Sequence, residues 1–251
     1  MLKIGKRDLQ HSNFQTIRFV MILSVIVSFL LSIAATQLKS MQIFNIELDK
    51  KKNILKSIGL DSSDLDSEKI IYEYNNKIKE VVINKDGSIN STVNFNNLVP
   101  IENKATGEVN YFIEDEEFLP AYISSNPEAF IFPISGKGLW GTLYGYFALS
   151  DDYDTVKGIT FYDHKETPGL GGEVEKKWFQ DNFIGKKIYN DNNHLVSITV
   201  VKGKVRDVIT GNGIKHAVDG ISGATITSKG LTTFLKRDLN RYENFFKKKR
   251  K

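Results

Sequence analysis

Residues 19–36 read FVMILSVIVSFLLSIAAT, a run of eighteen residues that contains no charge and is mostly apolar. A helix of this length, at about 1.5 Å per residue, spans roughly 27 Å, which is close to the thickness of a bilayer core. A cleaved signal peptide is the alternative, because residues 32–34 (SIA) resemble a small-residue cleavage site. The apolar core of a signal peptide usually covers only about 7–15 residues. We therefore predict a retained transmembrane helix over residues 16–37.

The charges beside this segment do not fix its orientation. Basic residues flank it in nearly equal numbers, so the positive-inside rule does not decide. They are Lys3, Lys6, Arg7 and Arg18 before it, and Lys39, Lys50, Lys51 and Lys52 after it. A short tail over residues 1–15 fits a cytoplasmic N-terminus, with the rest of the chain on the other side of the membrane.

Composition limits the kinds of chemistry that the chain can perform. Its 251 residues are 41% hydrophobic and 25% charged, as in a globular protein. The absence of cysteine excludes disulfides, thiolate nucleophiles and cysteine-ligated zinc or iron–sulfur sites. The net charge of +4 gathers at the ends of the chain, including residues 247–251, which does not favour nucleic-acid binding. The basic end is a solvated terminus, or it contacts lipid headgroups or a partner.

Downstream of the membrane segment, the pattern changes from helix to strand. Residues 38–60 carry apolar side chains at helical spacing up to a stop at Gly59, and residues 68–79 fit a second short helix. Strands are expected at residues 81–84, 130–134, 142–149, 158–162 and 195–201, before a helix over residues 229–246. We predict an α+β protein with a helical connector over residues 38–65 and one mixed α/β domain over residues 66–251.

Three glycine-rich stretches join these elements, where loops often carry function. They are GKGLWG at residues 136–141, HKETPGLGG at residues 164–172 and DGISGATITS at residues 219–228. The first lacks the spacing of a Walker loop, and the pattern around its Trp140 fits a core residue better than one that stacks on a flat ring. The second offers one His and one Glu, too few ligands for a metal site, and fits a sharp turn.

The third stretch surrounds Thr225 with small residues just before the last predicted helix. As a purely structural element it is a turn, with Thr227 or Ser228 as the N-cap. A helix N-terminus also attracts phosphate through its free N–H groups and its dipole. A serine-hydrolase elbow, G-x-S-x-G, does not fit, because the second glycine comes one place early and every histidine precedes Ser222.

The sequence DGISGAT at residues 219–225, with Thr227 following, resembles the flavinylation signature of FMN-binding domains. This family includes the C subunit of the sodium-translocating NADH:quinone reductase and the G subunit of the related Rnf complex. Residues 166–171 and 136–140 are similar to two further signatures of the family, and residues 52–55 to the start of the C subunit. Residues 171–175 (GGEVE) and 216–220 (HAVDG) favour the C subunit over the Rnf protein.

The resemblance implies covalent FMN on Thr225, joined by a phosphoester bond that a dedicated flavin transferase makes from FAD. Ser222, Gly223, Ala224 and Thr227 would surround the attachment point. Two stretches would supply the other flavin contacts. Leu139 and Trp140 would line the ring, with Leu170 packing beside it, and Glu166, Thr167 and Gly169 would contact the flavin or its chain.

The resemblance also implies a place in a larger enzyme. The chain would be an electron-transfer subunit of a translocase that oxidises NADH, reduces ubiquinone and exports Na⁺, with no complete active site and no metal of its own. It would assemble with other subunits in the bacterial inner membrane, with its soluble domain on the periplasmic side. The alternatives are the Rnf protein and a membrane-anchored binding protein without a redox role.

Overall fold

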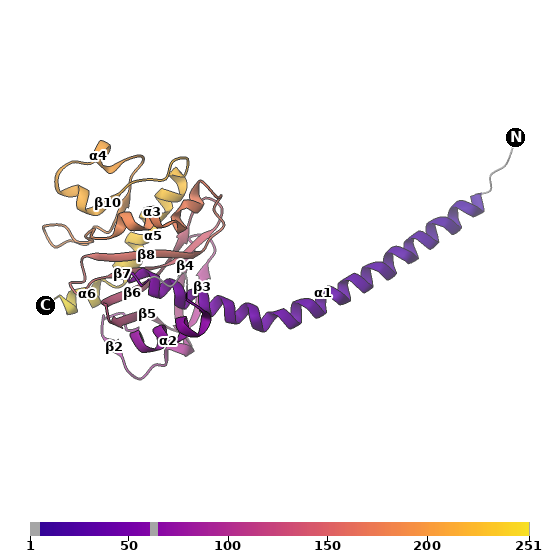
Figure 1. Ribbon diagram of the computed structural model, residues 1–251, viewed down its shortest axis with the longest axis horizontal. Coiled ribbons are helices and arrows are strands. Elements are labelled where there is room, and N and C mark those ends of the chain that lie inside the picture. Colours follow the sequence, from indigo (N-terminus) through magenta and orange to yellow (C-terminus); the bar gives the residue numbers. More distant parts are fainter. Residues whose placement is uncertain (1–5, 61–64, 251) are drawn as a thin grey trace. The chain divides into compact units, whose positions relative to one another are not determined.

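The computed structural model describes residues 6–60 and 65–250, with side chains from residue 13 onward. The chain divides into two compact units, Met1–Glu47 and Leu48–Lys251. The units share one helix, α1 (Lys6–Ser57), which begins in the first unit and ends in the second (Figure 1). The predicted helix over residues 16–37 and its helical continuation are therefore parts of a single element. Residues 6–15 of the predicted tail are helical as well, whereas residues 1–5 lie outside the described residues.

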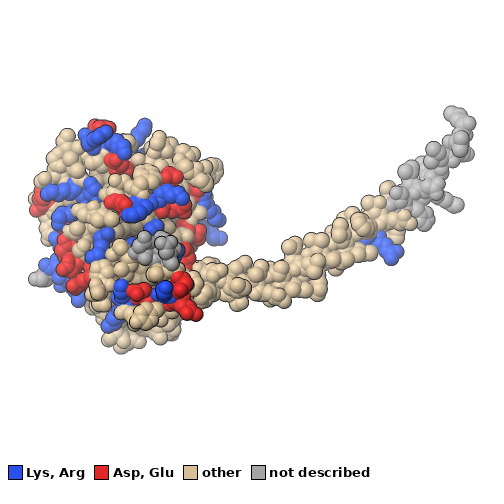
Figure 2. All heavy atoms as spheres, viewed as in Figure 1, with Lys and Arg blue, Asp and Glu red and all other residues tan. Residues whose placement is uncertain are grey.

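The membrane-length part of α1 is almost free of charge along its surface (Figure 2). Residues Asn13–Ser57 form a helix long and apolar enough to cross a membrane, with an 18-residue window of mean hydropathy 2.5 in which no residue is buried. Such exposure of apolar side chains is costly in water and favourable in a bilayer. Helix α1 ends two residues before Gly59, whose φ of +84° permits the turn that leaves the helix.

An antiparallel sheet organises the second unit. Its main path runs β2-β1-β5-β6-β7-β8, and the β3–β4 hairpin joins it through β5. The strands are β1 (Ile78–Ile83), β2 (Ile89–Asn90), β3 (Val99–Asn103), β4 (Glu108–Ile113), β5 (Glu116–Ser125), β6 (Glu128–Lys137), β7 (Thr142–Leu149) and β8 (Val156–Asp163). A small parallel pair, β9 (Thr199–Val200) and β10 (Ala217–Val218), lies outside this sheet.

Short helices complete the unit between and around the strands. The short helices are α2 (Ser67–Lys77), α3 (Lys177–Gln180), α4 (Val205–Val208) and α6 (Glu243–Lys249). The longer helix α5 (Thr225–Arg241) comes directly before α6. The 3₁₀ turns are η1 (Phe95–Asn97), η2 (Gly171–Glu175), η3 (Asp181–Phe183) and η4 (Gly211–His216).

Helices cover both faces of the sheet, which explains the apolar character of its central strands. On β6, Phe132 and Ile134 belong to the cluster that includes α5 and α6, whereas Ile131 belongs to the cluster under α2 and the end of α1. Two buried faces remove the apolar–polar alternation that a half-exposed strand shows. Gly230 of α5 lies so close to β6 that a Cβ there would collide with the carbonyl oxygen of Lys137.

Most expected elements are present, but three differ from the sequence pattern. The predicted strand over residues 195–201 is reduced to β9, because the chain turns at Ser197 with φ of +65°. Its amide donates to the carbonyl of Ile188, and Ile198 is fully buried as part of an irregular core segment. The first glycine-rich stretch, residues 136–141, begins as strand and not as loop, because β6 continues to Lys137.

The last predicted helix, over residues 229–246, is two helices. It starts earlier, at Thr225, and is interrupted at Tyr242. The Tyr242 hydroxyl donates to the carbonyl of Pro120 at 2.7 Å, and its ring packs on Phe132 with centroids 4.6 Å apart. These contacts anchor the break against the sheet.

Candidate functional site

One buried carboxylate joins the three glycine-rich stretches. Glu166 is 5% exposed and lies in the loop after β8. Its Oε1 accepts a hydrogen bond from the backbone N–H of Trp140 at 2.8 Å, in the loop between β6 and β7. Its Oε2 accepts a hydrogen bond from the hydroxyl of Thr227, in the first turn of α5. Loops that are far apart in sequence therefore form one site.

The hydrogen bonds around Glu166 keep it ionised. Burial alone raises the pKa of its carboxyl, but the Thr227 hydroxyl and the backbone N–H groups of Trp140, Leu139 and Gly141 outweigh that effect and lower the pKa. Hydrogen bonds to a carboxylate favour its charged form. Glu166 is thus a stable anion that organises the surrounding amides.

Glycine is needed where the loops approach this carboxylate. A Cβ at Gly138 would lie 2.6 Å from Oε1 of Glu166, and one at Gly171 would lie 2.7 Å from Oγ1 of Thr227. Real Cβ atoms do not approach this closely, so any side chain at either position would displace the carboxylate or its partner. The glycines of the first two stretches therefore serve the packing around Glu166.

Thr225 lies at the N-terminal end of α5 and is exposed. The N-cap is Ala224, which offers no side-chain cap hydrogen bond. The first N–H groups of a helix have no acceptor within the helix, so they are available to an anion beside Thr225. The expected caps were wrong, because Thr227 and Ser228 are buried inside the first turn and Thr227 is bonded to Glu166.

The third stretch (residues 219–228), called the attachment loop after the resemblance that it carries, touches the second stretch through Gly223. This residue has φ of +75°, and a Cβ on it would lie 2.6 Å from Cδ2 of Leu170. Ser222 and Gly223 are exposed, whereas Ala224 is only 3% exposed. Leu170 is therefore beside the loop that carries Thr225.

Four large apolar side chains are exposed on these loops. Leu139 is 47% exposed, Trp140 67%, Leu170 42% and Ile226 57%. The interpretation of Trp140 as a core residue is wrong, since its backbone is held by Glu166 while its ring faces solvent. Large apolar side chains that are exposed next to one site mark a candidate binding surface, and these four suit a flat aromatic ligand.

Thr167 and Gly169 form the tip of the second stretch. The carbonyl of Thr167 accepts hydrogen bonds from the N–H groups of Leu170 at 3.1 Å and Gly172 at 3.0 Å. Gly169 permits this turn with φ of +75°. Both residues are exposed. Nδ1 of His164 accepts from the N–H of Glu166 at 3.2 Å, and no group of metal-binding side chains occurs among the described residues.

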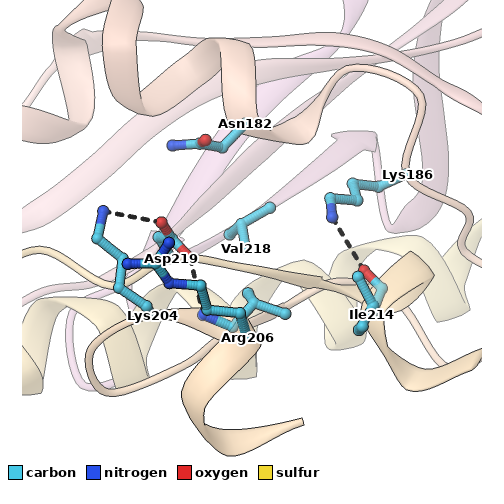
Figure 3. Close-up of a pocket in the computed structure, with 8 residues that line it drawn as sticks. Asn182, Lys186, Lys204, Arg206, Ile214, Val218 and Asp219 are labelled. Carbon is cyan, nitrogen blue, oxygen red and sulfur yellow. Dashed lines mark hydrogen bonds and ion pairs between the residues drawn. The ribbon is translucent and has the colours of Figure 1, made fainter. Parts of the chain in front are cut away.

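A cavity of about 350 Å³ lies beside the start of the attachment loop (Figure 3). Its lining combines residues of η3, α4, η4 and β10: Asn182, Lys186, Lys204, Val205, Arg206, Ile214, Val218 and Asp219. No sequence pattern predicts this cavity, because its side chains come from separate segments that no motif links. The only signal was Asp219, the first residue of the attachment signature.

Comparison with known proteins agrees with these observations. Residues 138–240 match the FMN-binding domain family, a range that contains every predicted flavin contact. The chain is 34% identical over 236 residues to the C subunit of the Na(+)-translocating NADH-quinone reductase of Vibrio alginolyticus, covering 86% of each chain. It is 31% identical over 240 residues to the corresponding Pseudomonas aeruginosa protein, covering 90% of this chain and 91% of that one.

A crystal structure of the C subunit from Parabacteroides distasonis shares this architecture. Its TM-score with this chain is 0.67 at 32% sequence identity. The match covers 83% of this chain and 96% of the other.

Proposed function

The chain belongs to the family of Na⁺-translocating NADH-quinone reductase C subunits, and on that premise we propose that it carries FMN covalently on Thr225. The bond is a phosphoester between the Thr225 hydroxyl and the flavin phosphate. The chain is then a membrane-anchored electron-transfer subunit of the reductase.

The observation that carries this proposal is the position of Thr225. Its hydroxyl belongs to an exposed residue at the start of a 17-residue helix. A helix of this length presents an N-terminal dipole that stabilises a phosphate. The neighbouring residues Gly223 and Ala224 add little bulk, so the hydroxyl is open to another enzyme.

The exposed apolar side chains provide the seat for the ring. Trp140 and Leu139 lie on one loop, Leu170 on another, and Ile226 beside Thr225. Burying large apolar surface stabilises by about 25 cal/mol per Å², so a tethered isoalloxazine gains by covering these side chains. Thr167 and Gly169, at the exposed loop tip, supply polar backbone groups to the flavin or its ribityl chain.

We assign Glu166 to positioning, not to flavin contact. Both of its carboxylate oxygens are bonded within the protein, to Trp140 N–H and to the Thr227 hydroxyl. Through these bonds it holds the ring-lining loop against the helix that bears Thr225. Ser222 and Gly223 shape the approach to the hydroxyl from the other side.

Attachment is the work of a separate flavin transferase. A threonine hydroxyl is a weak nucleophile that needs a base and an activated phosphoryl donor. The carboxylate of Glu166 is committed to hydrogen bonds and is ionised with a lowered pKa, so it is a poor base for Thr225. The chain holds and orients the product, and bound FMN supplies the redox chemistry.

The remaining roles follow from membership of the reductase. Helix α1 anchors the chain in the bacterial inner membrane, and the flavin domain lies on the periplasmic side. The NADH and ubiquinone sites lie on other subunits, and the assembled complex couples electron transfer to Na⁺ export. This subunit relays electrons between its neighbours.

The test is to replace Thr225 in a host with active flavin transferase. Thr225→Ala should abolish flavin fluorescence in a denaturing gel and leave the unmodified mass. Thr233→Ala is the matched control, because Thr233 is an exposed threonine of the same helix whose hydroxyl bonds only to the Lys229 carbonyl. Persistent covalent flavin in Thr225→Ala, or a modified peptide that lacks Thr225, would refute the assignment.

A further inference from the structure

The cavity beside Asp219 is lined by three basic side chains, called its basic rim below, and three apolar side chains, called its apolar floor. Lys186 approaches from the segment after η3, and Lys204 and Arg206 from the α4 region (Figure 3). Val205, Val218 and Ile214 supply the apolar lining. Basic and apolar side chains therefore line one cavity, an arrangement that differs from an ordinary solvated basic face.

The one carboxylate in the lining does not cancel this charge. Asp219 accepts hydrogen bonds from Nζ of Lys204 at 2.9 Å and from the N–H of Val205 at 2.8 Å. Lys186 donates from Nζ to the carbonyl of Ile214 at 2.9 Å, which uses one of its three N–H groups. The guanidinium of Arg206 lies 3.7 Å from Asp207, and its side chain is 84% exposed. The rim retains donors for an incoming anion.

The surface around the cavity has the same character. Between Val201 and Val218 the chain carries four basic residues and one acidic residue, which are Lys202, Lys204, Arg206, Lys215 and Asp207. Figure 2 shows Lys and Arg side chains at the edge of the domain where Figure 1 places α4. Val208 is 57% exposed and Ile214 42% exposed beside them. Arginine is enriched at protein interfaces relative to the rest of the protein surface.

The cavity is tied directly to the attachment loop. Asp219 opens that loop and caps α4 through Val205. The N–H of Gly220 donates to the carbonyl of Gly203 at 2.9 Å, which adds a second link. A partner in the cavity therefore lies next to the loop that leads to Thr225.

We propose that this cavity is a docking site for an acidic segment of another subunit of the reductase. The segment presents carboxylates to Lys186, Lys204 and Arg206 and an apolar side chain to the floor. Charge complementarity selects this occupant and fixes its register. The docking depends on subunit assembly and not on the covalent flavin bond.

The natural chain has no cysteine, so one introduced thiol reports on the surface. Val208→Cys places it beside the cavity, and Tyr72→Cys places a control thiol on α2, where Tyr72 is 67% exposed. A maleimide is reacted with each variant, as the isolated full chain and in the purified complex, and modification of this chain is followed by intact mass. In the complex, Val208→Cys should react about tenfold more slowly, as for a site about 90% occupied, while Tyr72→Cys should keep its rate.

The occupant is tested by neutralising the rim. Lys204→Gln combined with Arg206→Gln should remove the protection of Val208→Cys, and flavin fluorescence of the same samples should stay unchanged. Equal labelling of Val208→Cys in chain and complex would overturn the proposal. Protection that survives neutralisation, or protection of the isolated chain by adenosine monophosphate, would also overturn it. Retained fluorescence separates these failures from a failure of flavin attachment.

Discussion

Two buried carboxylates near opposite ends of helix α5 differ in ionisation. Glu166 meets its first turn and is 5% exposed, and Asp238 lies near its end and is 3% exposed. Hydrogen bonds lower the pKa of Glu166 against the effect of burial, whereas burial raises the pKa of Asp238 to about 6 despite the nearby Arg237. Similar exposure therefore gives opposite shifts.

The opposite pKa shifts arise from the hydrogen-bond donors that surround each carboxylate. Glu166 collects a hydroxyl and several backbone N–H groups from a glycine-rich loop. Asp238 accepts from the N–H of Ser135 at 2.9 Å and from Nε of Arg237 at 2.8 Å, between α5 and the sheet. A pocket built of amides stabilises a charge that a helix–sheet interface does not. The surroundings of Glu166, at the first turn of α5, therefore stabilise the ionised carboxylate, whereas those of Asp238, near the other end, favour the protonated form.

Removing the Glu166 carboxylate should have the largest effect. Glu166→Ala leaves the amides of the ring-lining loop and the Thr227 hydroxyl without their acceptor, and should lower the free energy of unfolding by about 3–4 kcal/mol. Urea unfolding of the full chain in detergent measures this. Glu175→Ala is the control, since that side chain is 47% exposed. Equal stability of the two variants would contradict the anchoring role.

The second-largest effect should be the change in unfolding free energy with pH that Asp238 causes. Its pKa is higher in the folded state, about 6, than its ordinary 3.8, so the folded state binds the extra proton. The protonated Asp238 carboxyl therefore contributes its full stabilisation below about pH 4. As the pH rises through about 6, the free energy of unfolding should fall by about 2–3 kcal/mol. Asp238→Asn should remove that loss.

Unfolding free energies at pH 4.5 and pH 7 for wild type and Asp238→Asn test this directly. Glu166 should change stability with pH in the opposite direction, because its pKa is lower in the folded state than in the unfolded state. The stabilisation from its carboxylate is present above the unfolded pKa and is lost as the pH falls through the folded pKa. If Asp238→Asn had the same pH slope as wild type between these values, the assignment of the titrating group would be wrong.

The smallest effect should come from the single donor Thr227. Thr227→Val keeps the shape of the side chain and removes one hydrogen bond to a charged acceptor, which costs about 1.5–2 kcal/mol. Differential scanning calorimetry against Thr233→Val, an exposed position of the same helix, measures it. A larger loss than in Glu166→Ala would show that the hydroxyl has another role.

Local patterns predicted much of the fold. The apolar run over residues 19–36 lies within helix α1, and the aromatic-rich strand at residues 142–149 matches β7 end to end. The prediction of a strand over residues 195–201 was wrong, because β-branched residues fill a core equally well from an irregular segment. The break at Tyr242 was missed because it depends on the distant carbonyl of Pro120.

The motifs located residues of the candidate site but not the contacts that join them. Leu139, Trp140, Leu170 and Thr225 were identified from motifs, and the structure places each of them exposed on the three stretches. That Glu166 connects those stretches is a contact between separated residues, and no local pattern encodes it. Asp238 was missed for the same reason, because its burial depends on β6.

The Glu166–Thr227 hydrogen bond also orders the events of biosynthesis. It joins residues 61 positions apart, so the loop of Glu166 is synthesised well before the helix that it must meet. The proposed attachment site at Thr225 is therefore complete only once α5 has folded against this loop. A transferase that requires the complete site would leave unfolded and misfolded copies without cofactor.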